Sequence, residues 1–185
     1  MKDIEVELKF KLPHKKTLLD FLEKNAVLHK ESFQKDSYFA PSYRDFFAER
    51  PINERLRIRE SNQGNSVNYK NWKEQDGKQL NYCDEYETPI EKPDQIEKIF
   101  QALDIQPVIV VNKKRKSFMY QNVEISVDEV EELGDFVELE MKGEFDSSEQ
   151  AVQKLYTLSN TLGLQRDWED NKGYPWLLLE KKGII

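Results

Sequence analysis

The sequence is short of the residues on which disulfides, membrane spans and secretion depend. Cys83 is the only cysteine among 185 residues, which excludes an internal disulfide and a cysteine-based metal site. No apolar run approaches the length of a membrane span. The opening residues, MKDIEVELK, contain no apolar signal-peptide core. We therefore expect a cytoplasmic protein that does not associate with membranes.

Histidine and glycine are also scarce. The two histidines, His14 and His29, belong to no motif, and the seven glycines form no phosphate-binding loop. A Ser-His-Asp set is missing as well, so any catalysis must depend on metal ions and basic side chains. The net charge of −7 argues against a general nucleic-acid binder, which needs a basic face. It still leaves room for a local basic pocket.

The composition nevertheless indicates a folded protein. Charged residues make up 34% and hydrophobic residues 38% of the chain, and the aromatic content of 11% is too high for a disordered protein. No low-complexity linker divides the sequence. We therefore expect a single domain over residues 1–185.

Hydrophobic periodicity predicts a chain dominated by strands. The predicted strands are 3–11, 34–39, 54–60, 66–73, 80–88, 108–118, 122–130 and 135–142. The predicted helices are 15–25, 94–103, 147–162 and 171–181. Capping-box spacing marks two helix starts, at Asp94 and Asp146, and Asp76-Gly77 predicts a hairpin turn.

Several of these strands alternate apolar with charged residues. In IEVELKF (4–10), Glu5, Glu7 and Lys9 lie between the apolar residues. ERLRIRE (54–60) alternates in the same way with three arginines, and FVELEM (136–141) with two glutamates. Some strand faces therefore carry only bases and others only acids.

Two arrangements explain such faces. For any single strand, an antiparallel sheet with one solvated, salt-bridged face is the simpler interpretation. Across at least six strands that interpretation weakens, because ordinary solvated faces mix their polar residues freely. The alternative is a closed barrel whose charged faces point inward and whose apolar faces lie outward under the helices. A lumen of mixed charge would suit a polyphosphate with divalent cations, since arginine and lysine bind phosphate and carboxylates bind hard cations.

At this point the sequence resembles a known family, the CYTH domain proteins or triphosphate tunnel metalloenzymes. The Glu-x-Glu-x-Lys pattern at 5–9 is similar to the family's N-terminal signature. Further segments follow in the family's order: DSYFAP (36–41), LRIRE (56–60), YK (69–70), YE (86–87), NKKRKSF (112–118), VDEVEELGDFVELE (127–140) and GY (173–174). Among its branches, the chain looks most like the class IV adenylyl cyclases. Trp72 and Pro175 depart from the pattern of that branch.

The resemblance implies an α+β fold, a tunnel of eight antiparallel strands with helices outside, and a role for each matching residue. The residues that match metal-binding carboxylates are Glu5, Glu7, Asp128, Glu138 and Glu140. Those that match triphosphate-binding bases are Lys9, Arg57, Arg59, Lys70, Lys113 and Arg115. We expect Lys9, Arg59 and Glu138 to take part in catalysis, whereas Glu85 and Glu87 match acidic tunnel residues without an assigned role. Lys114 faces outward by strand parity.

The expected cofactor is Mg²⁺ or Mn²⁺, and the expected ligand is a small molecule with a triphosphate group. In one reading the enzyme converts ATP to cyclic AMP and pyrophosphate. In another it hydrolyses thiamine triphosphate or tripolyphosphate, and a third, non-catalytic reading is a binder of nucleotide or polyphosphate. The family resemblance also suggests a homodimer.

Overall fold

The computed structural model describes residues 4–44, 46–47, 52–75 and 78–185. The elements run in the order β1 (Ile4–Lys11), α1 (Lys15–Asn25), β2 (Val27–Pro41), β3 (Glu54–Ser61), β4 (Asn65–Gln75), β5 (Lys78–Ile90), α2 (Pro93–Ala102), β6 (Ile105–Tyr120), β7 (Val123–Val130), β8 (Gly134–Met141), α3 (Ser148–Thr161), a 3-10 turn (Arg166–Trp168) and α4 (Tyr174–Lys181). The predicted Asp76-Gly77 turn lies outside the described residues.

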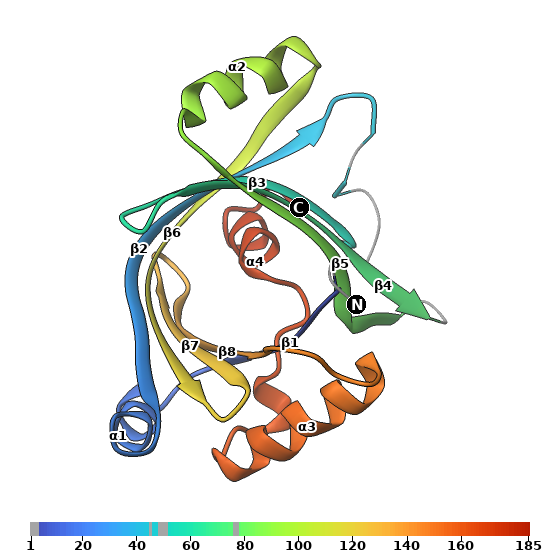
Figure 1. Ribbon diagram of the computed structural model, residues 1–185. Helices are drawn as coiled ribbons and strands as arrows, with labels where there is room; N and C mark the ends of the chain where they lie inside the picture. The colour runs from blue at the N-terminus through green and yellow to red at the C-terminus, as the bar shows by residue number, and fades with distance from the viewer. Residues whose placement is uncertain (1–3, 45, 48–51, 76–77) are drawn as a thin grey trace.

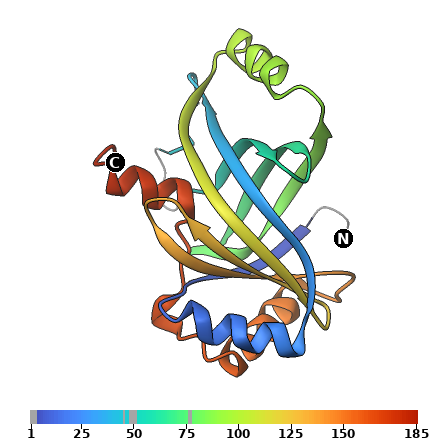
Figure 2. The same cartoon turned by 90° about the vertical axis from the view of Figure 1, so that its left-hand side faces the viewer.

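The eight strands form a closed antiparallel barrel in the order β1-β5-β4-β3-β2-β6-β7-β8. Figure 1 looks along the barrel, so its wall appears as a ring. The predicted α+β barrel is thereby confirmed. The described helices lie outside the strand ring or, in the case of α4, at one end of it (Figure 2).

The main core lies outside the barrel wall, under the helices. Val6, Leu8 and Phe10 of β1 pack in one cluster with Leu22 of α1 and Leu155 of α3. All five are at most 2% exposed. Because burying one such side chain contributes roughly 1.5–3 kcal/mol, this outward packing keeps β1 in register and leaves its charged face to the interior.

The strand β2 is much longer than the sequence predicts. It begins at Val27 instead of residue 34 and pairs with β6 along its whole length. Val27, Leu28 and Phe33 are exposed, so the early part of the strand has no alternation that could reveal it. The pairing partner, rather than the local pattern, determines where β2 begins.

Both predicted capping boxes are wrong by one or two residues. Helix α2 begins at Pro93, and no side chain caps it. Helix α3 begins at Ser148, with Ser147 as its N-cap: the Ser147 Oγ accepts a hydrogen bond from the Gln150 backbone N–H at 3.2 Å. A hydroxyl next to the carboxylate of Asp146 therefore provides the cap.

One end of the barrel interior is apolar and is closed by α4. Tyr38, Val111, Val130 and Phe136 point to the same face as the charged residues of their strands, but they form a cluster with Tyr174 and Leu178 of α4. Figure 1 shows α4 across the far end of the ring, and the side view of Figure 2 agrees. The charged interior is therefore accessible mainly from the opposite mouth. No helix within the described residues is long and apolar enough to cross a membrane.

Candidate functional site

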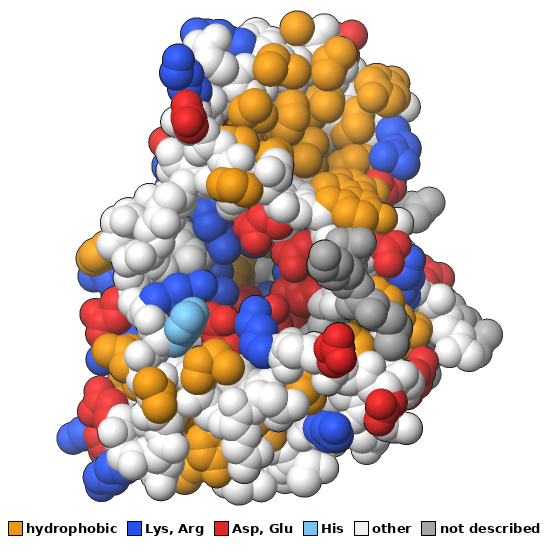
Figure 3. All heavy atoms as spheres, viewed as in Figure 1, with side chains coloured by type: hydrophobic (Ala, Val, Ile, Leu, Met, Phe, Trp, Pro, Cys, Tyr) orange, Lys and Arg blue, Asp and Glu red, His pale blue; other side chains and the backbone are white. Residues whose placement is uncertain are grey.

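The barrel encloses a cavity of about 150 Å³ whose wall is almost entirely charged. Nine lysines and arginines and seven glutamates line it: Lys9, Lys30, Arg55, Arg57, Arg59, Lys70, Lys113, Arg115 and Lys142, with Glu5, Glu7, Glu85, Glu87, Glu124, Glu138 and Glu140. Figure 3 shows the hollow with both colours of charge on its wall. The structure thus brings together every predicted site residue except Asp128.

Strand register sets which charges meet. Lys9 of β1 lies opposite Glu138 of β8, and Glu7 lies opposite Glu140. The Lys9 Nζ is 3.0 Å from a Glu138 carboxylate oxygen. The register therefore places opposite charges side by side at Lys9 and Glu138, and like charges side by side at Glu7 and Glu140.

Two arginines of β3 converge on a single buried carboxylate. The Arg59 guanidinium donates to both oxygens of Asp36, at 2.6 and 2.7 Å. Arg57 reaches the same carboxylate at 3.5 Å, and its Nε is buried without a hydrogen-bond partner. Although burial alone would raise it, these two arginines hold the pKa of Asp36 well below its ordinary value. Asp36 therefore aligns the arginines, a role that the sequence analysis did not assign.

Asp128, which the family resemblance predicts to be a metal ligand, is surrounded by hydrogen-bond donors in this structure. It is fully buried and is absent from the residues that line the cavity. Its carboxylate accepts hydrogen bonds from Arg115 Nε at 2.6 Å, Lys113 Nζ at 3.1 Å and the Tyr174 hydroxyl at 2.9 Å. The sequence could not show this, because the strand parity of an aspartate does not reveal whether cations already surround it.

Glu138 and Glu140 differ in their electrostatics, although both point into the cavity. Glu138 pairs with Lys9 and Arg115. These bases outweigh the effect of burial and lower the pKa of Glu138 well below its ordinary value. Burial, reinforced by Glu7, raises the pKa of Glu140 even though Lys142 pairs with it.

The other acidic residues centre on Lys70. Its Nζ pairs with Glu5 and lies 3.6 Å from Glu7 and 3.7 Å from Glu85. Lys70 and Lys9 together lower the pKa of Glu7 to about 2 against the opposing effect of burial. Burial dominates at Glu5, where neighbouring Glu7 also contributes, and the pKa of Glu5 is raised well above its ordinary value. At Glu5 and Glu140, burial and neighbouring carboxylates thus disfavour the charged form more than the lysines stabilise it.

Glu85 and Glu87, left without a role by the sequence, both line the cavity. Glu85 accepts a hydrogen bond from the Asn68 amide at 2.6 Å as well as facing Lys70. Glu87 accepts one from the Ser66 hydroxyl at 2.8 Å. Both glutamates belong to β5, and their hydrogen-bond partners belong to β4, the antiparallel strand next to it in the barrel.

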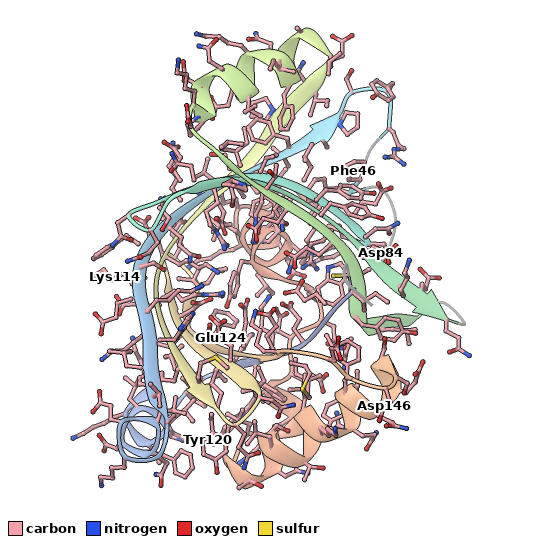
Figure 4. All side chains as sticks on the ribbon, in the orientation of Figure 1. Phe46, Asp84, Lys114, Tyr120, Glu124 and Asp146 are labelled. Carbon is pink, nitrogen blue, oxygen red and sulfur yellow. The ribbon has the colours of Figure 1, made fainter. Side chains whose placement is uncertain are left out.

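Four further charged residues of the cavity were not predicted as site residues: Lys30, Arg55, Glu124 and Lys142. Glu124 is 6% exposed and lies 3.4 Å from Lys142 Nζ and 3.7 Å from Lys30 Nζ. Figure 4 shows Glu124 inside the ring and Lys114 on its outer side, as strand parity predicts for Lys114. Parity could also have identified Glu124, which lies on the same face of β7 as Asp128. Lys30 lies in the part of β2 that the sequence does not predict.

Trp72 is explained by the arginine beside it. The Arg55 guanidinium lies 5.3 Å from the centre of the Trp72 ring, a distance typical of a cation–π contact. Arg55 also donates to the Lys172 carbonyl at 3.0 Å. Trp72 therefore supports a side chain that links the barrel to the segment leading into α4.

The donor chemistry suits a hard divalent cation, although the ligands are not assembled. Carboxylate oxygens are the ligands that Mg²⁺ and Mn²⁺ prefer. Burial and like charges raise the pKa values of Glu5 and Glu140, and a bound cation would stabilise their charged forms. Across the described part of the chain, however, no three acidic, histidine or cysteine side chains form a group that could hold a metal. Lys70 and Lys142 pair with these carboxylates instead. A cation would have to displace their ammonium groups.

Comparison with known proteins gives one family and one architecture. The model of the CYTH domain matches residues 3–174. A protein of Methanocaldococcus jannaschii named "Putative adenylate cyclase" is 31% identical over 183 residues, which cover 98% of this chain and 99% of that protein. A solved structure from Pyrococcus horikoshii has a TM-score of 0.77 at 29% identity, covering 96% of this chain and 99% of that one.

A more distant solved structure shares the fold. It comes from Hippeastrum, with a TM-score of 0.64 and 19% identity, covering 98% of this chain and 96% of that one. It is described as an adenylyl cyclase candidate with a dominant triphosphatase activity. At this identity the similarity is evidence of the fold alone.

Replacing the two glutamates of β8 should have opposite effects on stability. Glu138→Gln removes a carboxylate with which two buried bases, Lys9 and Arg115, pair, and we expect it to lower the free energy of unfolding by about 3 kcal/mol or more. Glu140→Gln removes a charge that the folded state disfavours, so this variant should be at least as stable as the original protein near neutral pH. Urea unfolding of the metal-free proteins measures both. Equal losses in the two variants would contradict the assignment.

Binding of a phosphate ligand should weaken at alkaline pH. Burial and neighbouring Arg115 lower the pKa of Lys113 to about 8, so its positive charge is lost as the pH rises through that value. Calorimetry with tripolyphosphate in the absence of metal should show affinity falling above about pH 8. Lys113→Arg, which keeps its charge, should remove this dependence. An unchanged profile in the arginine variant would show that another group titrates.

Proposed function

This chain belongs to the CYTH domain family, and from that membership we propose that its tunnel binds a triphosphate and catalyses a reaction on it that depends on a divalent metal. The observation that carries the proposal is the convergence of Arg57, Arg59, Lys113 and Arg115 on one enclosed cavity. Side chains of this kind bind phosphate oxygens through charge-assisted hydrogen bonds. The buried Nε of Arg57, which has no partner, is a donor that a phosphate oxygen would satisfy.

The charge balance of the cavity favours cations together with the triphosphate. The nine bases of the cavity wall face seven glutamates, and the buried Asp36 and Asp128 pair with four of these bases. The formal charges therefore balance, and no excess of positive charge is left to offset a triphosphate. We assign Glu5, Glu7 and Glu140 to hold Mg²⁺ or Mn²⁺. When bound, the metal would neutralise phosphate charge and stabilise the charge that develops in the reaction. Glu138 would instead align Lys9 and Arg115, with which it already pairs.

The reaction that we favour is cyclisation of ATP, which the adenylate cyclase name of the Methanocaldococcus relative supports. The ribose 3′-oxygen attacks the α-phosphorus and forms a new O–P bond. The bond to the bridging oxygen breaks, and pyrophosphate leaves with the electron pair. The hydroxyl proton passes to a basic group of the tunnel, while Arg59 and Lys113 stabilise the phosphate charge.

Hydrolysis is the second candidate. In this case water attacks the terminal phosphorus of thiamine triphosphate or tripolyphosphate and releases orthophosphate. The triphosphatase activity described for the Hippeastrum protein, which has the same fold, motivates this alternative. Both reactions would use the same arginines and lysines. They differ in which phosphorus atom meets the attacking oxygen.

A product assay separates these readings. The purified protein is incubated with Mg²⁺ or Mn²⁺ and with ATP, thiamine triphosphate or tripolyphosphate in separate reactions, and the products are resolved by chromatography. We expect cyclic AMP and pyrophosphate from ATP, and no turnover in excess chelator. Orthophosphate from tripolyphosphate without any cyclic AMP would replace the cyclase by a hydrolase. Binding of all three ligands without turnover would indicate a non-catalytic binder.

Arg57 is the best arginine with which to test the phosphate contacts. Its ion pair with Asp36 is the longer of the two, at 3.5 Å, so its removal should disturb the fold less than removal of Arg59. We expect Arg57→Ala to lower kcat/KM about a hundredfold, since loss of one such donor costs roughly 3 kcal/mol in the transition state. Arg44→Ala is the control, because the Arg44 side chain is 59% exposed and pairs with Glu54. Similar small effects in both variants would contradict the assignment of the tunnel.

A further inference from the structure

Tyr174 is a tyrosine at the closed end of the tunnel. It is the first residue of α4 and is 3% exposed. The Tyr174 ring packs in the apolar cluster at this end. It meets Phe136 edge to face at a centroid distance of 5.0 Å, and Leu178 is in the same cluster. It also lines the charged cavity. Tyr174 therefore lies at the boundary between the apolar closure and the bases.

The Tyr174 hydroxyl belongs to the network that holds the bases in place. It donates a hydrogen bond to Asp128 at 2.9 Å. The same carboxylate accepts from Arg115 and Lys113. The hydroxyl meets the Asp128 Oδ2 oxygen, which Lys113 and one Arg115 nitrogen also contact. It therefore helps to fix the orientation in which Asp128 binds the two bases.

The Tyr174 ring also contacts two cations directly. The Lys9 Nζ lies 4.4 Å from the ring centre, and the Lys113 Nζ lies 4.9 Å from it. Both distances are within the range of cation–π attraction, which grows when the cation is desolvated. Both lysines are at most 8% exposed. Tyr174 thus contacts Lys9 and Lys113 through its ring and reaches Arg115 through Asp128.

The chain entering α4 is held firmly, which places Tyr174 accurately. Gly173 has φ +81°, and a Cβ at this position would lie 2.8 Å from the Arg55 guanidinium. The Gly173 backbone N–H donates to Asp170 at 3.1 Å. Only glycine combines this backbone conformation with the close approach of Arg55. The barrel therefore controls where α4 begins.

Packing in the apolar end does not by itself explain why residue 174 is a tyrosine. Leucine or phenylalanine would fill the same space without burying a hydroxyl, which is costly unless the hydroxyl is hydrogen-bonded. We propose that Tyr174 is a positioning residue that sets Lys9, Lys113 and Arg115 for the triphosphate from the closed end of the tunnel. This inference rests on the proposed function, because it assumes that these bases bind a triphosphate.

Three single variants test the proposal. Tyr174→Phe keeps the ring and loses the hydroxyl, Tyr174→Leu loses both, and Leu178→Ala loosens the packing of α4 without touching a base. If the Leu178→Ala protein does not fold, Leu177→Ala takes its place. Each protein is measured for tripolyphosphate binding by calorimetry in the absence of metal, for kcat and KM on the substrate that the product assay identifies, and for its Tm.

We expect a different pattern for each variant. Tyr174→Leu should weaken tripolyphosphate binding about tenfold, because two buried cations lose their aromatic contact. Tyr174→Phe should bind within about twofold of the original protein but lower kcat about tenfold, because Asp128 is no longer held. Leu178→Ala should lower the Tm and leave the Kd of the folded protein within about twofold of the original. In the Asp128→Asn background, Tyr174→Phe should cause little further loss of kcat.

The outcomes distinguish this inference from the proposed function. If the unaltered protein does not bind tripolyphosphate, the proposed function fails and the inference fails with it. If it binds, but Tyr174→Leu binds equally well, only the positioning role is overturned. The same holds if Leu178→Ala weakens binding as much as Tyr174→Leu, or if the Phe and Asn substitutions reduce kcat independently.

Discussion

The constraint on which this structure depends is that every charge pointing into the barrel must be compensated there. Moving an ion out of water costs several kcal/mol even after relaxation, and a partner offsets this cost only when the geometry is good. Fully buried Asp36 and Asp128 meet the condition by each binding two bases. The apolar faces of the same strands must then lie outside, which is why α1 and α3 cover the barrel wall. The interior charge pattern thus determines the position of the core.

The compensation is uneven, and this unevenness suits the proposed chemistry. Asp36 and Glu138 have lowered pKa values because bases surround them, so they serve to hold arginines and lysines in place. Glu5 and Glu140 have raised pKa values because burial and like charges outweigh their lysine partners. A ligand that brings both phosphate and a divalent cation would suit both groups of residues. The cation would stabilise the charged forms of the glutamates, and the phosphate would bind the bases.

The C-terminal segment completes the site instead of merely following it. Arg55, supported by the Trp72 ring, holds the chain where it enters α4. Helix α4 then closes one end of the tunnel, with Tyr174 among the bases and Leu178 in the apolar cluster. A tunnel closed in this way directs a ligand to enter from the other mouth and to meet the lysines and arginines at its inner end.

The sequence by itself determined the strands and the face on which each charge lies, because side chains alternate along a strand and the apolar half of each pattern must be buried. IEVELKF and ERLRIRE are sufficient to place Glu5, Lys9 and Arg57 on the faces opposite their apolar neighbours, and the same parity separates Lys114 from Lys113 and Arg115. Only the tertiary structure decided which charges meet. The tight ion pairs of Asp128, the early start of β2 at Val27 and the insertion of Tyr174 depend on strand register and on contacts between segments distant in the chain. Local patterns contain no information about such partners, since the energy of a buried charge is set by the groups that surround it.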